Sequence, residues 1–156
     1  MVAQLDIPRA ALRLDDAELG AAVMLLAAPD HPSLADPATR AALDTLTAAG
    51  IVQDGRITGF PARLLAVVAA PKLRVTVESF VGLQTVVEQA WATEREGVWG
   101  AVAGDGQVEL APIEPSLIPW AIARAVGLGP REQPARGPLV VPAEPLGLAN
   151  ERLGAG

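Results

Sequence analysis

Cysteine and tyrosine are missing from the 156-residue sequence, and histidine occurs only once. Without cysteine the chain forms no disulfide, offers no thiol nucleophile and supplies no thiolate ligand to zinc or iron–sulfur clusters. A single histidine excludes a metal site built from several imidazoles, and the absence of tyrosine removes phenol chemistry. We therefore expect a protein that is not an enzyme, with no catalytic residues, no bound metal and no cofactor.

Basic residues are also scarce, with 12 Lys and Arg against 18 Asp and Glu and a net charge of −6. Nucleic-acid binders usually carry a basic surface, so we expect no nucleic-acid partner. A helix–hairpin–helix pattern around Gly50 is reminiscent of a winged helix, but Asp36, Asp44 and Asp54 dilute its positive charge.

No apolar run approaches the roughly 18 residues of a membrane span, and the N-terminus lacks the pattern of a signal peptide. We expect a cytoplasmic protein without membrane insertion.

What the sequence does contain is typical of a globular chain, with 51% hydrophobic residues. Its length predicts one domain, because domains average about 150 residues. Residues 131–156 are rich in proline, glycine and arginine at their start, which is typical of a linker. We therefore predict an α+β domain over residues 1–130, followed by a linker in residues 131–156.

The first half of the chain predicts three helices. A short apolar strand at 10–14 precedes a helix at 16–27, for which Asp15, Asp16 and Glu18 suit an N-terminal cap better than a metal site or an acid pair. A second helix begins near Ser33 or Asp36 and ends at Gly50. The Asp54–Gly55 pair predicts a tight hairpin turn, and a third helix covers 61–70. His31 is interpreted as a surface turn residue.

The second half predicts mainly strands. Apolar and polar residues alternate at 73–77, and Gly104-Asp105-Gly106 connects strands at 98–103 and 107–113. Residues 83–91 fit both a helical and a strand period; their valine and threonine content favours a strand. A last helix follows Pro115. The predicted fold is an antiparallel β-meander packed with helices on one side.

Residues 7–22 and 141–156 show an internal similarity, which is carried by Pro8/Pro142, Leu12/Leu146, Leu14/Leu148, Leu19/Leu153, Gly20/Gly154 and Ala21/Ala155. Such self-similarity is typical of a repeat, although chance explains it equally well in a chain rich in Ala, Leu, Gly and Pro. If it is a repeat, residues 131–156 include the first strand of a second unit, and the chain is one unit of a pseudo-two-fold pair.

The large aromatic residues are the candidates for partner binding. Tryptophan usually packs in cores, but it is also enriched at binding hot spots. In the predicted hairpin Trp99 lies on the face opposite Val98 and Val102, so something other than the first set of helices must cover it. We predict a partner-binding surface at Trp91, Glu94, Arg95 and Trp99, where the charged pair would set the register of the partner.

Three segments resemble the EspG family, the cytosolic chaperones of type VII (ESX) secretion found across actinobacteria. They are Ala48-Ala-Gly-Ile-Val-Gln-Asp-Gly-Arg56, Ala69-Ala-Pro-Lys-Leu-Arg-Val-Thr-Val77 and Gly97-Val-Trp-Gly-Ala-Val-Ala-Gly-Asp-Gly-Gln-Val-Glu-Leu-Ala-Pro-Ile113. The resemblance covers about residues 7–142 and corresponds to one half, the N-terminal unit, of the two pseudo-symmetric α+β halves in that family.

The resemblance implies a chaperone or adaptor that binds helical, PE–PPE-like secretion substrates and keeps them soluble. It transfers no individual binding residue to this chain. The alternative is a homodimeric structural or regulatory α+β module that interacts with other proteins. An enzyme that relies on carboxylates and arginine alone has no support in the sequence.

Overall fold

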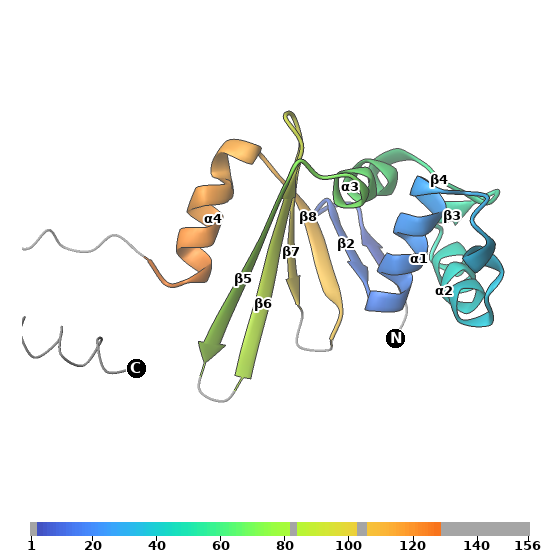
Figure 1. The fold of residues 1–156 in the computed structure, drawn as a ribbon, viewed down its shortest axis with the longest axis horizontal. Helices are drawn as coiled ribbons and strands as arrows, with labels where there is room; N and C mark the ends of the chain where they lie inside the picture. Colours follow the sequence, from blue (N-terminus) through green and yellow to red (C-terminus); the bar gives the residue numbers. More distant parts are fainter. Residues whose placement is uncertain (1–2, 82–83, 103–105, 129–156) are drawn as a thin grey trace, which may run out of the picture.

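The centre of the structure, a computed structural model, is an antiparallel sheet of six strands (Figure 1). The structure describes residues 3–81, 84–102 and 106–128. In spatial order the strands are β1 (Gln4–Asp6), β2 (Ala11–Leu14), β8 (Val108–Ile113), β7 (Gly97–Val102), β6 (Gln84–Ala92) and β5 (Leu73–Val81). Strands β5 to β8 form the predicted meander, which confirms the α+β class.

Strand β6 resolves the ambiguous segment in favour of the strand. It pairs with β5 over nine residues, from Leu73 opposite Ala92 to Val81 opposite Gln84. Its end is buried on both faces, because Ala90, Trp91 and Ala92 are all in the core. Apolar residues therefore stand at consecutive positions, and this is why the segment also fits a helical period.

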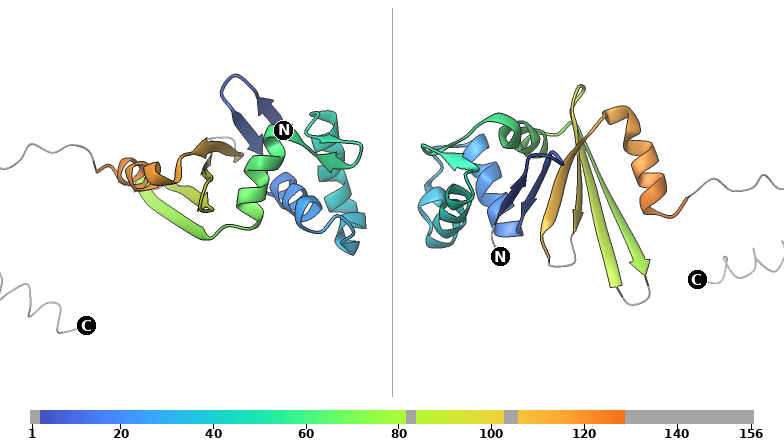
Figure 2. Two further views of the ribbon diagram at one scale, coloured as in Figure 1. Left: turned by 90° about the horizontal axis from the view of Figure 1, so that it is seen from above. Right: turned by 180° about the vertical axis from the view of Figure 1, so that it is seen from behind.

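One face of the sheet, called here the helix face, is covered by α1 (Asp16–Ala27) and α3 (Gly59–Ala69), and α2 (Pro37–Ala48) packs against α1 on the side away from the sheet (Figures 1 and 2). The bounds of α1 are those predicted. Its N-terminus is a capping box, in which the Asp15 carboxylate accepts from the Glu18 backbone N–H at 2.8 Å and the Glu18 carboxylate accepts from the Asp15 backbone N–H at 2.9 Å. The buried carboxyl group of Glu18 therefore has a hydrogen-bond partner in the backbone.

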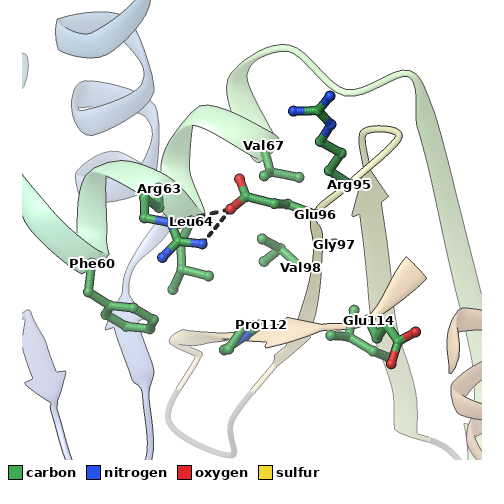
Figure 3. A pocket seen from close by; sticks show the side chains of 11 residues that line it. Phe60, Arg63, Leu64, Val67, Arg95, Glu96, Gly97, Val98, Pro112 and Glu114 are labelled. Carbon is green, nitrogen blue, oxygen red and sulfur yellow. Dashed lines mark hydrogen bonds and ion pairs between the residues drawn. The ribbon is translucent and has the colours of Figure 1, made fainter. Parts of the chain in front are cut away.

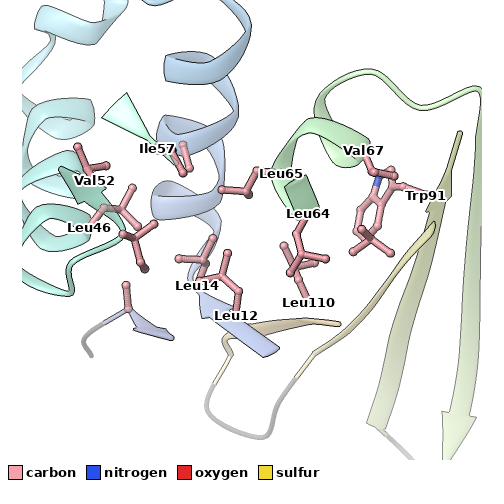
Figure 4. Packing of buried hydrophobic residues seen from close by; sticks show 14 residues of the cluster. Leu12, Leu14, Leu46, Val52, Ile57, Leu64, Leu65, Val67, Trp91 and Leu110 are labelled. Carbon is pink, nitrogen blue, oxygen red and sulfur yellow. The ribbon is translucent and has the colours of Figure 1, made fainter. Parts of the chain in front are cut away.

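The main core lies between these helices and the sheet (Figure 4). Leu12 and Leu14 of β2, Leu110 of β8 and Val98 of β7 are fully enclosed there and meet Leu65 of α3. Burying several large aliphatic side chains contributes about 1.5–3 kcal/mol each, so this cluster holds the helices to the sheet.

A 3₁₀ turn at Pro32–Ala35, which includes Ser33, precedes α2.

The predicted small hairpin is present as β3 (Val52–Gln53) and β4 (Arg56–Ile57), which pair with each other. Its turn residues Asp54 and Gly55 have φ angles of 50° and 69°, the left-handed values that a two-residue hairpin turn requires. The hairpin closes the far side of the main core, because Val52 and Ile57 are both buried in it.

A fourth helix, α4 (Ile118–Ala125), lies on the opposite face of the sheet, called here the α4 face (Figure 1). It follows a 3₁₀ turn at Pro115–Leu117. Ile118 and Ile122 pack with Ala90, Ala92 and Trp99 in a second, smaller cluster, which also contains Val75 and Ile113. Helices therefore lie on both faces of the sheet and not on one side as predicted, because α4 packs over the face that carries Trp99.

Strand β1, which pairs antiparallel with β2, was not among the predicted strands. Strand β2, the predicted strand at 10–14, also pairs with β8 from Leu12 opposite Leu110 to Leu14 opposite Val108. The proposed domain boundary at residue 130, the linker and the similar segment at 141–156 lie outside the described residues.

Candidate partner-binding site

A pocket of about 380 Å³ opens at the end of the sheet where α3 meets the β6–β7 turn and the end of β8 (Figure 3). Its volume is at the small end of the range for binding pockets, roughly 300–1,000 Å³. Three separate parts of the chain form it, which are α3, residues 95–98 and residues 112–114.

The floor of the pocket is apolar. Phe60, Leu64 and Val67 come from α3, where their spacing of four and three residues places them on one side of the helix. Val98 and Pro112 are opposite each other on β7 and β8 and complete the floor from the sheet. The floor offers dispersion contacts but no charged group, so it suits an apolar side chain.

The rim of the pocket carries charges of both signs. The Arg63 guanidinium donates to Glu96 Oε1 from Nε at 3.2 Å and from Nη2 at 2.5 Å. Arg95 stands on the same turn, and Glu114 lies at the end of β8. This pattern of an apolar centre inside a polar, charged rim is typical of protein-binding surfaces.

The turn that carries Arg95 and Glu96 is held by Thr93. The Thr93 hydroxyl accepts from the backbone N–H groups of Arg95 at 3.3 Å and Glu96 at 3.1 Å. The Thr93 backbone N–H donates to the Glu96 carbonyl at 2.8 Å. On the other side of the turn, Lys72 forms an ion pair with Glu94 at 2.5 Å. The turn presents its charged side chains from a fixed backbone.

The structure brings two of the four predicted site residues together and separates the other two. Glu94 and Arg95 are neighbours on the exposed turn, and Arg95 lines the pocket. Trp91 and Trp99 point to opposite faces of the sheet, because Trp91 pairs with Val98 and Trp99 pairs with Ala90. No single face carries both tryptophans.

Trp91 belongs to the main core. Only 4% of it is exposed, and its ring lies against the helix-face cluster, with the Arg74 guanidinium 5.9 Å from the ring centre. A partner does not reach it in this fold, so Trp91 is corrected from a contact residue to a core residue. The reason is that α3 covers the end of β6.

Trp99 is partly buried on the α4 face. Its indole N–H donates to Glu88 Oε1 at 3.2 Å, and its ring packs against the cluster that holds α4. A second hollow beside it is lined by Glu88, Ala121 and Arg124. Trp99 thus serves first to attach α4, and only part of it faces solvent.

The sequence analysis did not select Trp120, the tryptophan that is most exposed, at 74%. It lies on α4 and points away from the sheet, with Leu117 and Leu128 as other exposed apolar residues nearby in the sequence. A signal was available, because Trp120 lies outside the apolar stripe that Ile118, Ala121 and Ile122 form. Phe60 was likewise not selected, since a sequence does not show that α3 meets the β6–β7 turn.

Within the described residues no three acidic or histidine side chains gather in a way that could hold a metal ion. The longest helices of these ranges, α1 and α2, have 12 residues each, too few to cross a bilayer.

These features define an α+β fold with a small apolar pocket that has a charged rim. No protein-family model matches this chain, and no curated protein matches its sequence. The assignment of a function therefore depends on the residues themselves.

Proposed function

We propose that this protein is a non-enzymatic chaperone or adaptor of type VII secretion, which binds helical, PE–PPE-like secretion substrates in the cytoplasm and keeps them soluble. The observation that carries the proposal is the pocket between α3 and the β6–β7 turn, with its apolar floor and mixed-charge rim. The resemblance to the EspG family over residues 7–142 supports the same reading.

A helix can dock there by one apolar side chain. An amphipathic helix presents anchors at spacings of three and four residues, so one anchor enters the floor while its neighbours reach the rim. Arg95 is exposed on the rim and free to meet an acidic side chain of the partner, since no ion pair of Arg95 is found in the described residues. Opposite charges at a rim set register and partner choice more than affinity.

Holding an exposed apolar side chain of the partner in this pocket would keep that side chain from aggregating. The chain itself contributes no chemistry to this task. It contributes shape, through α3 and β8, and charge, through a turn whose backbone is fixed by Thr93. The exposed Trp120 on α4 is a second apolar contact that a larger partner could use.

The test is binding to a panel of purified PE–PPE-type helical heterodimers, measured by calorimetry and by their solubility on co-expression. Pro112→Arg places a long side chain over the exposed floor, and Arg95→Glu reverses the rim charge. Each variant should weaken binding at least tenfold, which corresponds to about 1.4 kcal/mol.

The matched control is Arg56→Glu, which makes the same charge change on the exposed β4 strand, away from the pocket. It should bind like the unmodified protein. If Pro112→Arg and Arg95→Glu bind every heterodimer as well as the control does, the pocket is not the binding site. If the unmodified protein binds none of them, the proposed function is wrong.

A further inference from the structure

Strand β5 is an edge that the described structure leaves open. It pairs with β6 on one side, and no other strand of the described residues pairs with it on the other. It is nine residues long, its register with β6 is unbroken by a bulge, and no proline lies within it. Long, regular edges are ready to pair with another strand, and most proteins protect them with prolines or bulges.

The exposed side chains of β5 on the helix face are Arg74, Thr76, Glu78 and Phe80, because α1, α2 and α3 do not reach over this edge. In the view from above, β5 lies at the end of the sheet far from the β1–β2 hairpin (Figure 2, left). On the helix face these side chains are therefore exposed beside the open edge, while on the other face α4 contacts β5 at Val75.

Arg74 and Glu78 carry opposite charges on this edge, yet they do not meet. They lie four residues apart, about 13 Å along a strand at roughly 3.3 Å per residue. Arg74 donates to the Gln89 side chain at 3.4 Å, and Glu78 makes no hydrogen bond or ion pair with any described residue. An antiparallel partner strand can bring each charge opposite its complement.

We propose that two copies of this chain associate edge to edge through β5, antiparallel about a two-fold axis at Thr76. A two-fold axis perpendicular to the sheet keeps each face on the same side, so paired residues must share a face and their numbers must add to an even sum. With the axis at Thr76, Arg74 of each copy lies opposite Glu78 of the other, which gives two ion pairs.

The same register suits the α4 face. Val75 of each copy lies opposite Val77 of the other, and Leu73, which is half exposed in the single chain, lies opposite Ser79. Directly opposed side chains of an antiparallel pair are about 4.5–5.5 Å apart between their Cβ atoms, close enough for these contacts. The pairing therefore completes the edge hydrogen bonds, joins apolar residues on one face and joins opposite charges on the other.

Other two-fold registers fit less well. An axis at Arg74 or at Glu78 places that charge opposite its own copy, which is repulsive. An axis at Val77 places Arg74 opposite Phe80. An axis at Val75 places Glu78 opposite Lys72, which already forms an ion pair with Glu94. Thr76 is the axis position that places Arg74 of each copy opposite Glu78 of the other.

The first experiment is sedimentation equilibrium of the purified full chain and of variants in which the charge of Arg74 or Glu78 is reversed. Arg74→Glu and Glu78→Arg should each weaken the dimer at least tenfold, because each places two like-charged pairs across the axis. The double variant R74E/E78R restores both opposite-charge pairs and should recover dimerisation. A chain that is monomeric at about 100 µM, or a double variant no better than the single ones, overturns the proposal.

The second experiment tests the register by cross-linking. Because the sequence has no cysteine, an introduced cysteine is the only thiol in each chain. Thr76→Cys places one thiol per chain at the axis, so mild oxidation should give a disulfide-linked dimer. Thr85→Cys places a thiol at another exposed position, on the same face of β6 but away from the axis, and should cross-link much less. Equal cross-linking of the two variants overturns the register.

This inference does not depend on the proposed chaperone activity, because both experiments use the purified chain without any partner. Loss of helical-substrate binding in Pro112→Arg leaves the dimer test unchanged. A dimer abolished by Arg74→Glu while substrate binding persists would place the two surfaces at separate ends of the sheet.

Discussion

At the scale of single residues, the contact between Trp91 and Gly100 shows how closely the helix face is packed. A Cβ atom at Gly100 would lie 2.7 Å from Cζ3 and 3.0 Å from Cη2 of the Trp91 ring, and 3.1 Å from Leu110 Cδ2. The ring of Trp91 can therefore lie over β7 only because position 100 has no side chain. Both residues are buried, so neither can shift into solvent.

Gly100→Ala should destabilise the fold by about 1–3 kcal/mol, the usual cost of overpacking a core. The matched control is Gly20→Ala on the exposed side of α1, where a Cβ meets nothing within 4 Å. There alanine should stabilise the protein by about 1 kcal/mol through its higher helix propensity. Urea denaturation followed by circular dichroism measures both changes, and a neutral Gly100→Ala would contradict the packing argument.

At the scale of elements, the sequence predicted those whose signals are local. The bounds of α1 follow from its capping box at Asp15 and from Pro29, and the β3–β4 turn follows from Asp54 and Gly55. Both depend on the preferences of a few neighbouring residues. The choice of a strand was also correct for residues 84–91, because β-branched residues favour a pleated surface.

Elements and sites that depend on distant partners escaped prediction. Strand β1 is three residues long and exists because Gln4–Asp6 pair with β2. The pocket joins Phe60 to Pro112, which are far apart in the sequence, and no local pattern reports that contact. In the meander Trp99 lies opposite Ala90, the neighbour of Trp91. Successive side chains of a strand point to opposite faces of the sheet, so the two tryptophans could not share one surface.

Helix α4 is attached by a small cluster, so it should be the element that opens first. Ile118 is its one buried residue, and the cluster around it is separate from the main core. Ile118→Ala should cost about 2–4 kcal/mol locally. Hydrogen exchange should then accelerate in α4 and at the Trp99 indole N–H, while α1 keeps its protection. Equal acceleration in α1 would show that the two clusters unfold together.

At the scale of the whole molecule, the sheet joins strands from near the beginning and near the end of the described chain. Strand β2 joins β8, with Leu12 opposite Leu110. Without β8, the β1–β2 hairpin has no neighbour in the sheet, and the enclosed side chains of Leu12 and Leu14 lose one wall of the main core.

A chain that ends at residue 107 should therefore fail to fold, although it keeps α1, α2, α3 and the other five strands of the sheet. A chain that ends at residue 128 keeps every described contact and should unfold cooperatively on heating. Near-ultraviolet circular dichroism distinguishes the two, because the buried Trp91 gives a signal only in a fixed environment. A cooperative transition in the shorter chain would contradict the role of β8.

The pairing of β2 with β8 also has a consequence during protein synthesis. Leu12 leaves the ribosome 98 residues before Leu110 does, since 110 − 12 = 98. At translation rates of roughly 5–20 residues per second, β8 is synthesised about 5–20 seconds after the β1–β2 hairpin with which it pairs. The nascent chain thus exposes Leu12 and Leu14, which later form part of its core. During this interval these side chains are open to aggregation, before the chain can fold.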